Sequence, residues 1–396
     1  MRKNRGYFFF PLFLLMVMAA GCWEGQEINE RAFVFAVAFD LPESEDGEEG
    51  AGSTEGGNGE EKVPKFTMSV QVPDPSQMAG SSEQNQGGGS GRPFIILGTT
   101  ASTVLSGLQQ LQRELDRTLF LGHTRLILIG EGVAREYGIE RVLDYFIRNF
   151  QIQRVARVAV VEGKAREILE QMPPIGQEPT TFLLNLLSGA GGTSLVYVSD
   201  LGKYMVENSN IGLEPVLPRV RKSGDAILTG GAAAIRGDRL AGWLTPFETR
   251  GLNILKNEFV GSDYEVECPF HPGDRINVAV VKTNAQHRLV REGKTLTLKI
   301  LVRGVFETTE FTGEHGPEEE LSKELTQRVA AEILNETRSA LNKARELKAD
   351  VIGIGKRIRA KQNKNWQGMD WGEEFPAFPV EIEVKMEWAQ TIRRLE

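Results

Sequence analysis

Apolar and polar positions alternate with two periods along the chain, and each period predicts one kind of element. In the segment 378–392 apolar residues occupy every second position, which is typical of a strand with one buried and one solvated face. The apolar residues of this alternation are Val380, Ile382, Val384, Met386 and Trp388. In the segment 318–348 apolar residues recur every three to four positions, which predicts a helix of about 30 residues. Its apolar face carries Leu321, Leu325, Val329 and Ile333.

Strand and helix patterns follow one another through the first half of the chain. The segment 32–39 is apolar at every position, which is typical of a central strand that is buried on both faces. Residues 65–72 alternate and predict a second strand. Farther along, the pattern predicts helices at 99–119, 139–147 and 164–172, and strands at 126–129 and 155–161. This order of strands and helices implies a parallel pair with a helical crossover.

After the extended, proline-containing segment 214–219, the sequence pattern becomes typical of β-strands. Strands are predicted at 226–236 and 239–244, around a Gly237-Asp238 turn that is a strong hairpin signal. We therefore expect three folded units, which are an N-terminal α/β unit at 22–215, a small β-rich unit at 216–285 and a C-terminal unit at 286–396.

Two segments of the N-terminal unit have the composition of flexible chain. Residues 43–62 are nearly all Glu, Asp, Gly and Ser, so they cannot bury enough apolar surface to offset the entropy lost on ordering. Residues 79–92 are rich in Gly, Ser and Gln. We expect a disordered insert and a flexible loop. The strands beside them can still pair, because the cost of loop closure rises slowly with loop length.

The N-terminus has the three parts of a secretory signal peptide. Basic residues at positions 2, 3 and 5 precede an apolar run from 7 to 18, and small residues then lead to Cys22. This order predicts a lipoprotein signal at 1–21, with acyl chains on Cys22 and the mature protein outside the cytoplasm on a membrane. The alternatives are an ordinary secretory signal cut near Ala20 and an uncleaved anchor. The apolar run has about 14 residues, whereas a spanning helix needs ~20.

The charge of the chain narrows the possible partners. Its 396 residues have a formal net charge of −8, and removal of the three basic residues of the signal leaves −11. Such an acidic protein is unsuited to nucleic acid and to electrostatic attachment to anionic lipid. We therefore expect no nucleic-acid partner, and we expect the acyl chains to hold the protein at the membrane.

The reactive side chains form no catalytic motif. If Cys22 is acylated, Cys268 has no partner for a disulfide, and its apolar surroundings predict a buried structural thiol. The four histidines are His123, His271, His287 and His315. They lie too far apart in sequence for a usual metal pair, and no nucleophile elbow, phosphate loop or zinc-protease motif occurs. We expect no enzymatic activity, no cofactor and no metal.

Two further features have a functional and a structural interpretation. Residues 189–194 are rich in glycine, but they do not join a strand to a helix in the dinucleotide-binding pattern, so a loop is expected. Trp366 and Trp371 could form an aromatic patch that faces a partner, or a cap on the C-terminal core. The cap is the favoured interpretation.

Four stretches, in order, resemble the Ger(x)C family of spore germination lipoproteins. They are residues 21–40, 122–138 and 232–252, and the long helix followed by 350–355, Trp366 and the closing strand. The resemblance implies a mixed α/β (α+β) fold of three domains, each a β-sheet with packed helices. It also implies the C subunit of a nutrient germinant receptor, held by lipid on the outer face of the spore inner membrane. Such subunits assemble with a permease-like integral membrane subunit and a second membrane subunit.

We therefore expect a lipid-anchored, non-enzymatic receptor subunit that is needed for nutrient-triggered germination. The alternative is a membrane-anchored solute-binding lipoprotein that acts independently, which would have a deep pocket between its domains. An exported cell-wall or phosphate-releasing enzyme would need converging carboxylates or a metal ion, and the scarcity of histidine argues against it.

Overall fold

A computed structural model describes residues 30–43, 65–74, 93–174, 178–189, 193–271, 273–293, 295–311, 318–361, 366 and 368–389. The signal peptide expected at 1–21, the lipidation site Cys22 and the flexible loop expected at 79–92 lie outside the described residues. The same holds for the acidic insert beyond Glu43.

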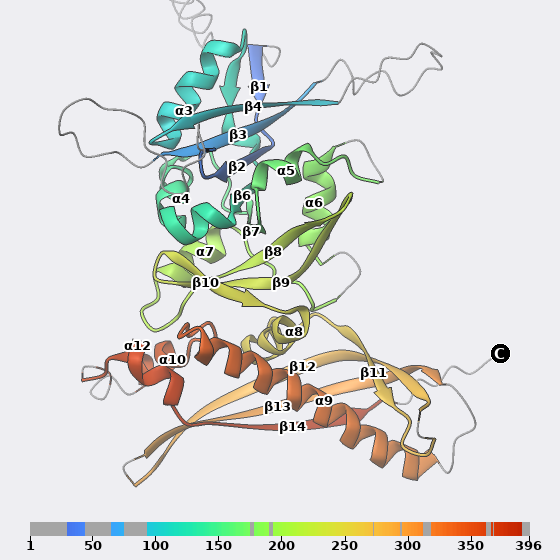
Figure 1. Ribbon diagram of the computed structural model, residues 1–396. Helices are drawn as coiled ribbons and strands as arrows, with labels where there is room; N and C mark the ends of the chain where they lie inside the picture. Colours follow the sequence, from blue (N-terminus) through green and yellow to red (C-terminus); the bar gives the residue numbers. More distant parts are fainter. Residues whose placement is uncertain are drawn as a thin grey trace, which may run out of the picture.

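The first half of the chain forms an eight-stranded mixed sheet in the order β10-β9-β8-β7-β6-β2-β3-β4 (Figure 1). The four central strands β2, β6, β7 and β8 run parallel, and antiparallel strands flank them on both sides. The strands are β2 (Ala36–Asp40), β3 (Phe66–Pro73), β4 (Phe94–Ala101), β6 (Leu126–Gly130), β7 (Arg157–Glu162), β8 (Val216–Ser223), β9 (Ala226–Arg236) and β10 (Arg239–Leu244).

Helices cover both faces of this sheet. Val37 and Phe39 of β2 belong to one buried cluster, together with side chains of α3 (Val104–Leu111), α4 (Ile139–Arg148) and α7 (Leu201–Asn208). Ala36 and Ala38 belong to another cluster, with α5 (Ala165–Glu170) and α6 (Pro179–Leu187). The predicted burial of β2 on both faces is confirmed, which is the usual situation of a central parallel strand.

A small parallel sheet lies beside the large one. It pairs β1 (Arg31–Phe33) with β5 (Thr118–Phe120). Figure 1 shows β1 at the end of the molecule that is opposite the C-terminal half. The segment 32–39 was expected to be one strand, but it is divided between β1 and β2. At the break, the backbone N–H groups of Val34 and Phe35 donate to the carbonyl oxygens of Phe120 and Gln71 respectively.

The C-terminal half forms a four-stranded sheet in the order β11-β12-β13-β14, with β13 and β14 parallel. Its strands are β11 (Ser262–Glu267), β12 (Arg275–Glu292), β13 (Thr295–Phe311) and β14 (Val380–Trp388). The long helix α9 (Glu318–Glu346) crosses this sheet (Figure 1). The remaining helices are α8 (Pro246–Lys256), α10 (Ile354–Lys361) and α12 (Trp371–Glu374). The predicted long helix and closing strand are thus present, and the mixed α/β class is confirmed.

The predicted unit boundaries do not follow these two sheets. Residues 216–244 were expected to belong to a separate middle unit, but they supply β8, β9 and β10 of the first sheet. The reason is that β8 pairs in parallel with β7, where Val160 lies opposite Arg219. Pro218 is accommodated at a register shift in β8, which is a position where a strand tolerates proline. The expected boundary at 285/286 falls inside the continuous strand β12.

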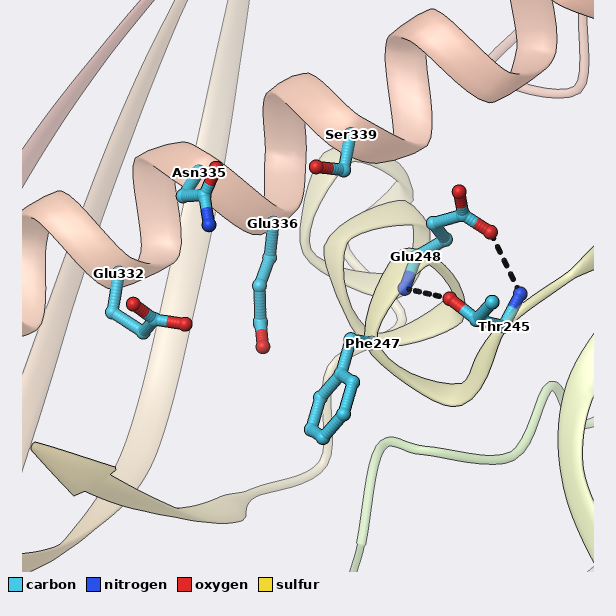
Figure 2. A pocket seen from close by; sticks show the side chains of 7 residues that line it. All are labelled: Thr245, Phe247, Glu248, Glu332, Asn335, Glu336 and Ser339. Atoms are coloured by element: carbon cyan, nitrogen blue, oxygen red, sulfur yellow. Dashed lines mark hydrogen bonds between the residues drawn. The ribbon is translucent and has the colours of Figure 1, made fainter.

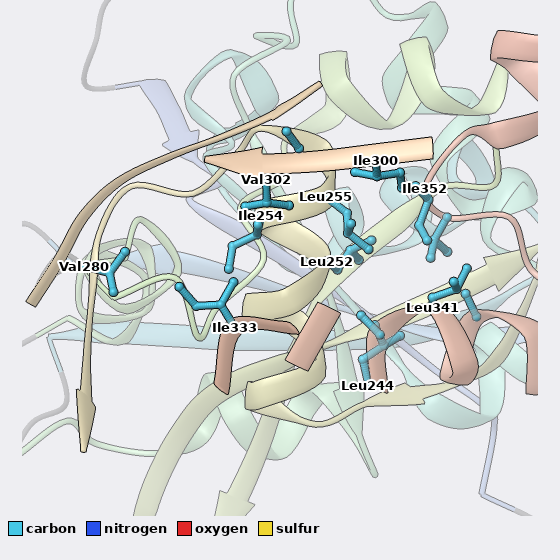
Figure 3. Close-up of a cluster of buried hydrophobic side chains, with 14 of the residues drawn as sticks. Leu244, Leu252, Ile254, Leu255, Val280, Ile300, Val302, Ile333, Leu341 and Ile352 are labelled. Carbon is cyan, nitrogen blue, oxygen red and sulfur yellow. The ribbon is translucent and has the colours of Figure 1, made fainter. Parts of the chain in front are cut away.

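The two halves share a hydrophobic core around α8, which Figure 1 shows between the two sheets. Leu244 of β10 and Leu252 and Leu255 of α8 belong to the same buried cluster as side chains from β12, β13 and α9 (Figure 3). Ile300 and Ile333 lie on the C-terminal side of this cluster. Because one core continues across the junction, we expect the two sheets to unfold together.

Helices α8 and α9 approach so closely that Gly251 has no room for a side chain. A Cβ at this position would overlap the main-chain carbonyl of Glu336 in α9. We expect Gly251→Ala to lower the free energy of unfolding by about 1–3 kcal/mol, because backbone cannot move aside as a side chain would. Urea denaturation measures this effect. Gly372→Ala is the matched control, since a Cβ there meets only ordinary contacts; an equal loss in both variants would contradict the close approach.

Candidate interaction site at the junction of the two sheets

Helix α8 is fixed at both ends, so it holds its side chains in defined positions. At its start the Thr245 hydroxyl accepts from the Glu248 N–H, and the Glu248 carboxylate accepts from the Thr245 N–H at 2.7 Å. This capping box stabilises the first turn. At its end Asn257 takes a left-handed conformation, and its side-chain amide donates to the Ala285 carbonyl and accepts from the Ala285 N–H. Helix α8 is therefore tied directly to β12.

A buried ion pair joins α8 to α9. The Arg250 Nε lies 2.9 Å from Oε2 of Glu336, and a second Arg250 nitrogen donates to Oε1. Only 5% of the Arg250 side chain and 4% of the Glu336 side chain are exposed. The remaining Arg250 donor, Nη1, reaches the Ser262 hydroxyl at 2.9 Å and the Asp263 carbonyl at 2.8 Å. One arginine thereby connects α8, α9 and the start of β11.

Tyr264 completes this cluster. Its hydroxyl donates to Oε2 of Glu336 at 3.1 Å, and the centre of its ring lies 3.6 Å from the Arg250 guanidinium carbon. Burial raises the pKa of the Glu336 carboxyl, and the hydrogen bonds and charge of Arg250 oppose that shift. Burial also raises the pKa of the Tyr264 phenol. Since donors and acceptors are matched, the cluster acts as a structural connection between the helices.

A small cleft opens beside this ion pair, between the start of α8 and α9 (Figure 2). It has a volume of about 260 Å³. Its lining consists of Thr245, Phe247, Glu248, Glu332, Asn335, Glu336 and Ser339. Phe247 is 59% exposed. Pockets for small organic ligands usually have volumes of ~300–1,000 Å³ and are mostly apolar. This cleft is smaller and largely polar, so it does not match the deep pocket expected of a solute-binding lipoprotein.

A second buried charge pair crosses the junction. The Lys256 ammonium at the end of α8 lies 2.6 Å from Oε1 of Glu207 in α7. The Tyr197 hydroxyl donates to the same oxygen, and the Val216 N–H donates to Oε2. Both charged side chains are over nine-tenths buried. Next to this pair, Lys203 of α7 binds Glu258 at 2.6 Å. The first sheet and α8 are therefore held together by directional polar contacts as well as by the hydrophobic core.

Trp366 and Trp371 pack onto the C-terminal core, as the cap interpretation predicts. Their ring centroids lie 5.8 Å apart. The Trp371 indole N–H donates to the buried carboxylate of Asp350 at 3.0 Å. Asp350 also accepts from the backbone N–H groups of Gly353, Ile354 and Gly355 at the start of α10. Burial raises the pKa of Asp350, and these four hydrogen bonds oppose the shift.

The cysteine and the histidines that the sequence analysis singled out form no common site among the described residues, although Cys268 and His271 lie close together. Cys268 is buried, as predicted, and its Sγ lies 3.8 Å from Nδ1 of His271. His123 packs against Phe33, and His315 lies outside the described residues. Within the part of the chain that the structure describes, no three His, Cys, Asp or Glu side chains are placed to hold a metal ion. No described helix combines the length and the apolarity needed to cross a bilayer.

The junction residues were not recognised individually from the sequence. Arg250 and Glu336 are separated by 86 positions, and Glu207 and Lys256 by 49. A sequence alone does not show that such charges meet. The usable signal was Arg250 within the stretch 232–252 that carries the family resemblance, where it stands between Thr249 and Gly251.

His287 of β12 predicts a pH dependence of stability. Burial and the charges of Arg357 and Lys361 on α10 lower the pKa of its imidazole from 6.5 to about 4, although hydrogen bonds to backbone oppose this shift. The folded state therefore prefers neutral imidazole. The stabilisation is fully present above pH 6.5, and it is lost as the pH falls toward about 4, because the unfolded chain then binds a proton that the folded chain does not.

The variant His287→Gln removes this titration. We expect its urea midpoint to fall less steeply between pH 6.5 and pH 4 than that of the unchanged protein. Parallel pH profiles for the two proteins would contradict the buried neutral histidine.

Comparison with known proteins gives a consistent result over nearly the whole chain. A family model described as the spore germination protein N-terminal domain matches residues 24–222, and one described as spore germination B3/GerAC like, C-terminal, matches residues 230–394. The putative spore germination protein YfkR of Bacillus subtilis strain 168 is 24% identical, over 93% of this chain and 92% of its own length. Spore germination protein KC of the same organism is 22% identical, over 94% and 93%.

The fold also has a solved counterpart. The crystal structure of the GerBC protein superposes with a TM-score of 0.56 at 16% sequence identity, covering 86% of this chain and 96% of that one. At this identity the superposition establishes the shared fold alone.

Proposed function

The chain belongs to the Ger(x)C family of spore germination proteins, and from that premise we propose that it is a lipid-anchored, non-enzymatic subunit of a spore nutrient germinant receptor. The observation that carries the proposal is the extent of the family match. The two family models follow one another from residue 24 to residue 394, with only residues 223–229 between them. The relatives named above are likewise matched over more than nine-tenths of their length.

The N-terminal sequence supports a lipid anchor at Cys22. The apolar run, the small residues and the cysteine stand immediately before residue 24, where the family match begins. A signal followed by a folded family region fits export of the body and acylation of Cys22. Two acyl chains are sufficient for stable membrane attachment, whereas one is marginal. In this proposal the protein lies on the outer face of the spore inner membrane.

The junction supports a structural rather than a catalytic role. Its buried charges are paired, and Glu336 accepts hydrogen bonds from both Arg250 and Tyr264. Groups held in this way rigidify a protein and are poorly placed to exchange protons with a substrate. We propose that the rigid body docks on a permease-like integral membrane subunit and on a second membrane subunit. Anchoring raises the effective concentration of such contacts, so individually weak ones suffice.

Deletion of the gene tests this proposal. Spores without the chain should fail to germinate with the nutrient that their receptor detects, and a copy expressed in trans should restore the response. The same spores should still germinate with nutrients that other receptors detect, which controls for general damage. A deletion strain that responds to every nutrient as its parent strain does would contradict the proposal.

A further inference from the structure

We propose that the end of the molecule formed by β1, β5 and α3 lies against the lipid surface; this inference rests on the lipid anchor of the proposed function. The β1–β5 end, as we call it, comprises residues 30–33 and 102–123. Its occupant is the headgroup layer of the bilayer, with aromatic and arginine side chains in contact with it.

The length of chain between the anchor and the fold limits where the membrane can be. Arg31 follows Cys22 by nine residues, and a fully extended chain spans at most ~3.3–3.6 Å per residue. Strand β1 therefore starts within about 30 Å of the bilayer surface. Eight strands spaced ~4.8 Å apart extend over roughly 34 Å, and the second sheet lies beyond β10. The short segment between Cys22 and Arg31 thus favours membrane contact through the β1–β5 end and disfavours contact through the second sheet.

The side chains at this end suit a membrane interface. Phe33 and Phe120 pack edge to face, with ring centroids 5.7 Å apart, and His123 contacts Phe33 at 4.9 Å. The Arg31 guanidinium lies 4.7 Å from the centre of the Phe120 ring. On α3, Leu105 is 52% exposed. Aromatic side chains that lie next to cationic or polar side chains are typical of the membrane–water interface.

The distribution of charge gives the same orientation. Residues 30–33 and 102–123 carry three arginines and three carboxylates, in a chain whose net charge is −8. The four strands of the second sheet carry nine carboxylates and seven lysines or arginines, and six of these carboxylates are exposed on the edge strands β11 and β14. An anionic bilayer repels the second sheet more than it repels the β1–β5 end. The acyl chains thus attach the protein to the membrane, and the difference in charge between its two ends favours the orientation with the β1–β5 end toward the lipid.

The test uses the full, acylated chain in vesicles of phosphatidylglycerol and phosphatidylethanolamine whose headgroups carry a nitroxide quencher. A fluorophore is attached to Thr118→Cys on β5 or, as the matched control, to Val281→Cys on β12. Both positions are exposed, and the native Cys268 is buried. We expect the probe at position 118 to be quenched several-fold more strongly than the probe at 281. Equal quenching, or stronger quenching at 281, would overturn the orientation.

Flotation of the vesicles separates this inference from the proposed function. A chain that does not float with the vesicles lacks its lipid anchor. This result would contradict the lipid-anchor part of the proposed function, and the inferred orientation would fail with it. A chain that floats but whose probe at position 118 is unquenched is anchored with another face toward the lipid. That outcome overturns the proposed orientation but leaves the lipid anchor intact. The same conclusion holds if the β1–β5 end contacts a protein partner instead of lipid.

Charge variants supply the second readout. Arg113→Gln combined with Arg117→Gln removes two exposed cations from the β1–β5 end. We expect weaker quenching at position 118 on anionic vesicles, unchanged flotation, and recovery with lysine at both positions. Arg288→Gln combined with Arg303→Gln in the second sheet is the control and should leave the quenching unchanged. If both pairs act alike, the proposed orientation is wrong.

Discussion

Replacing Glu336 with alanine is expected to lower the free energy of unfolding by about 3–5 kcal/mol. The substitution leaves the Arg250 guanidinium buried among α8, α9 and β11, where the Ser262 hydroxyl and the Asp263 carbonyl remain as its hydrogen-bond acceptors. It also removes the acceptor of the Tyr264 hydroxyl. Urea denaturation followed by circular dichroism measures the loss.

Two controls separate the lost ion pair from other effects. Glu332→Ala removes an exposed carboxylate one turn earlier on α9, and it should change stability by less than about 0.5 kcal/mol. Arg250→Met combined with Glu336→Leu removes both charges, and it should recover most of the loss because no unpaired charge is left buried. A Glu336→Ala protein as stable as the Glu332→Ala protein would show that the pair does not hold the helices together.

Replacing Cys22 with alanine is expected to leave a folded protein and to abolish nutrient-triggered germination. The substitution removes the proposed site of acylation, whereas the first described strand begins nine residues later. Without acyl chains, the acidic body has no electrostatic attraction to an anionic membrane. Germination of spores that carry the variant measures the effect, and membrane fractionation measures its cause.

Cys268→Ala is the matched control for this substitution. It removes the other cysteine, which is buried in the C-terminal half, and leaves the N-terminus intact. We expect membrane attachment and germination to persist in this variant. Normal germination with an unprocessed, unacylated Cys22→Ala protein would contradict the lipid-anchor proposal.

Elements with a strong local period could be predicted from the sequence. The helix expected at 318–348 is α9 at Glu318–Glu346, and the strand expected at 378–392 is β14 at Val380–Trp388. Where the period was weaker the prediction was wrong. The helix expected at 99–119 is confined to Val104–Leu111, and it lies between β4 and β5, two strands that the pattern did not indicate.

The arrangement of the strands and the junction site depended on contacts between distant residues. The proline-containing stretch 214–219 resembled a boundary, but most of it belongs to β8, and parallel pairing with β7 places β8 within the first sheet. The partners of Arg250 and Lys256 lie on α9 and α7, and no local pattern identifies them. Burial of these charges is stable only when both partners are in place, which is a property of the fold and not of a sequence window.

The most direct test of the central claim is co-purification of this chain from detergent-solubilised spore inner membrane, with the bound proteins identified by mass spectrometry. Our account predicts recovery of a permease-like membrane subunit together with a second integral membrane subunit. The same extract from spores that carry Cys22→Ala should yield neither. Recovery of the chain alone, under conditions in which other membrane complexes stay intact, would contradict the receptor-subunit proposal and favour an independent solute-binding lipoprotein.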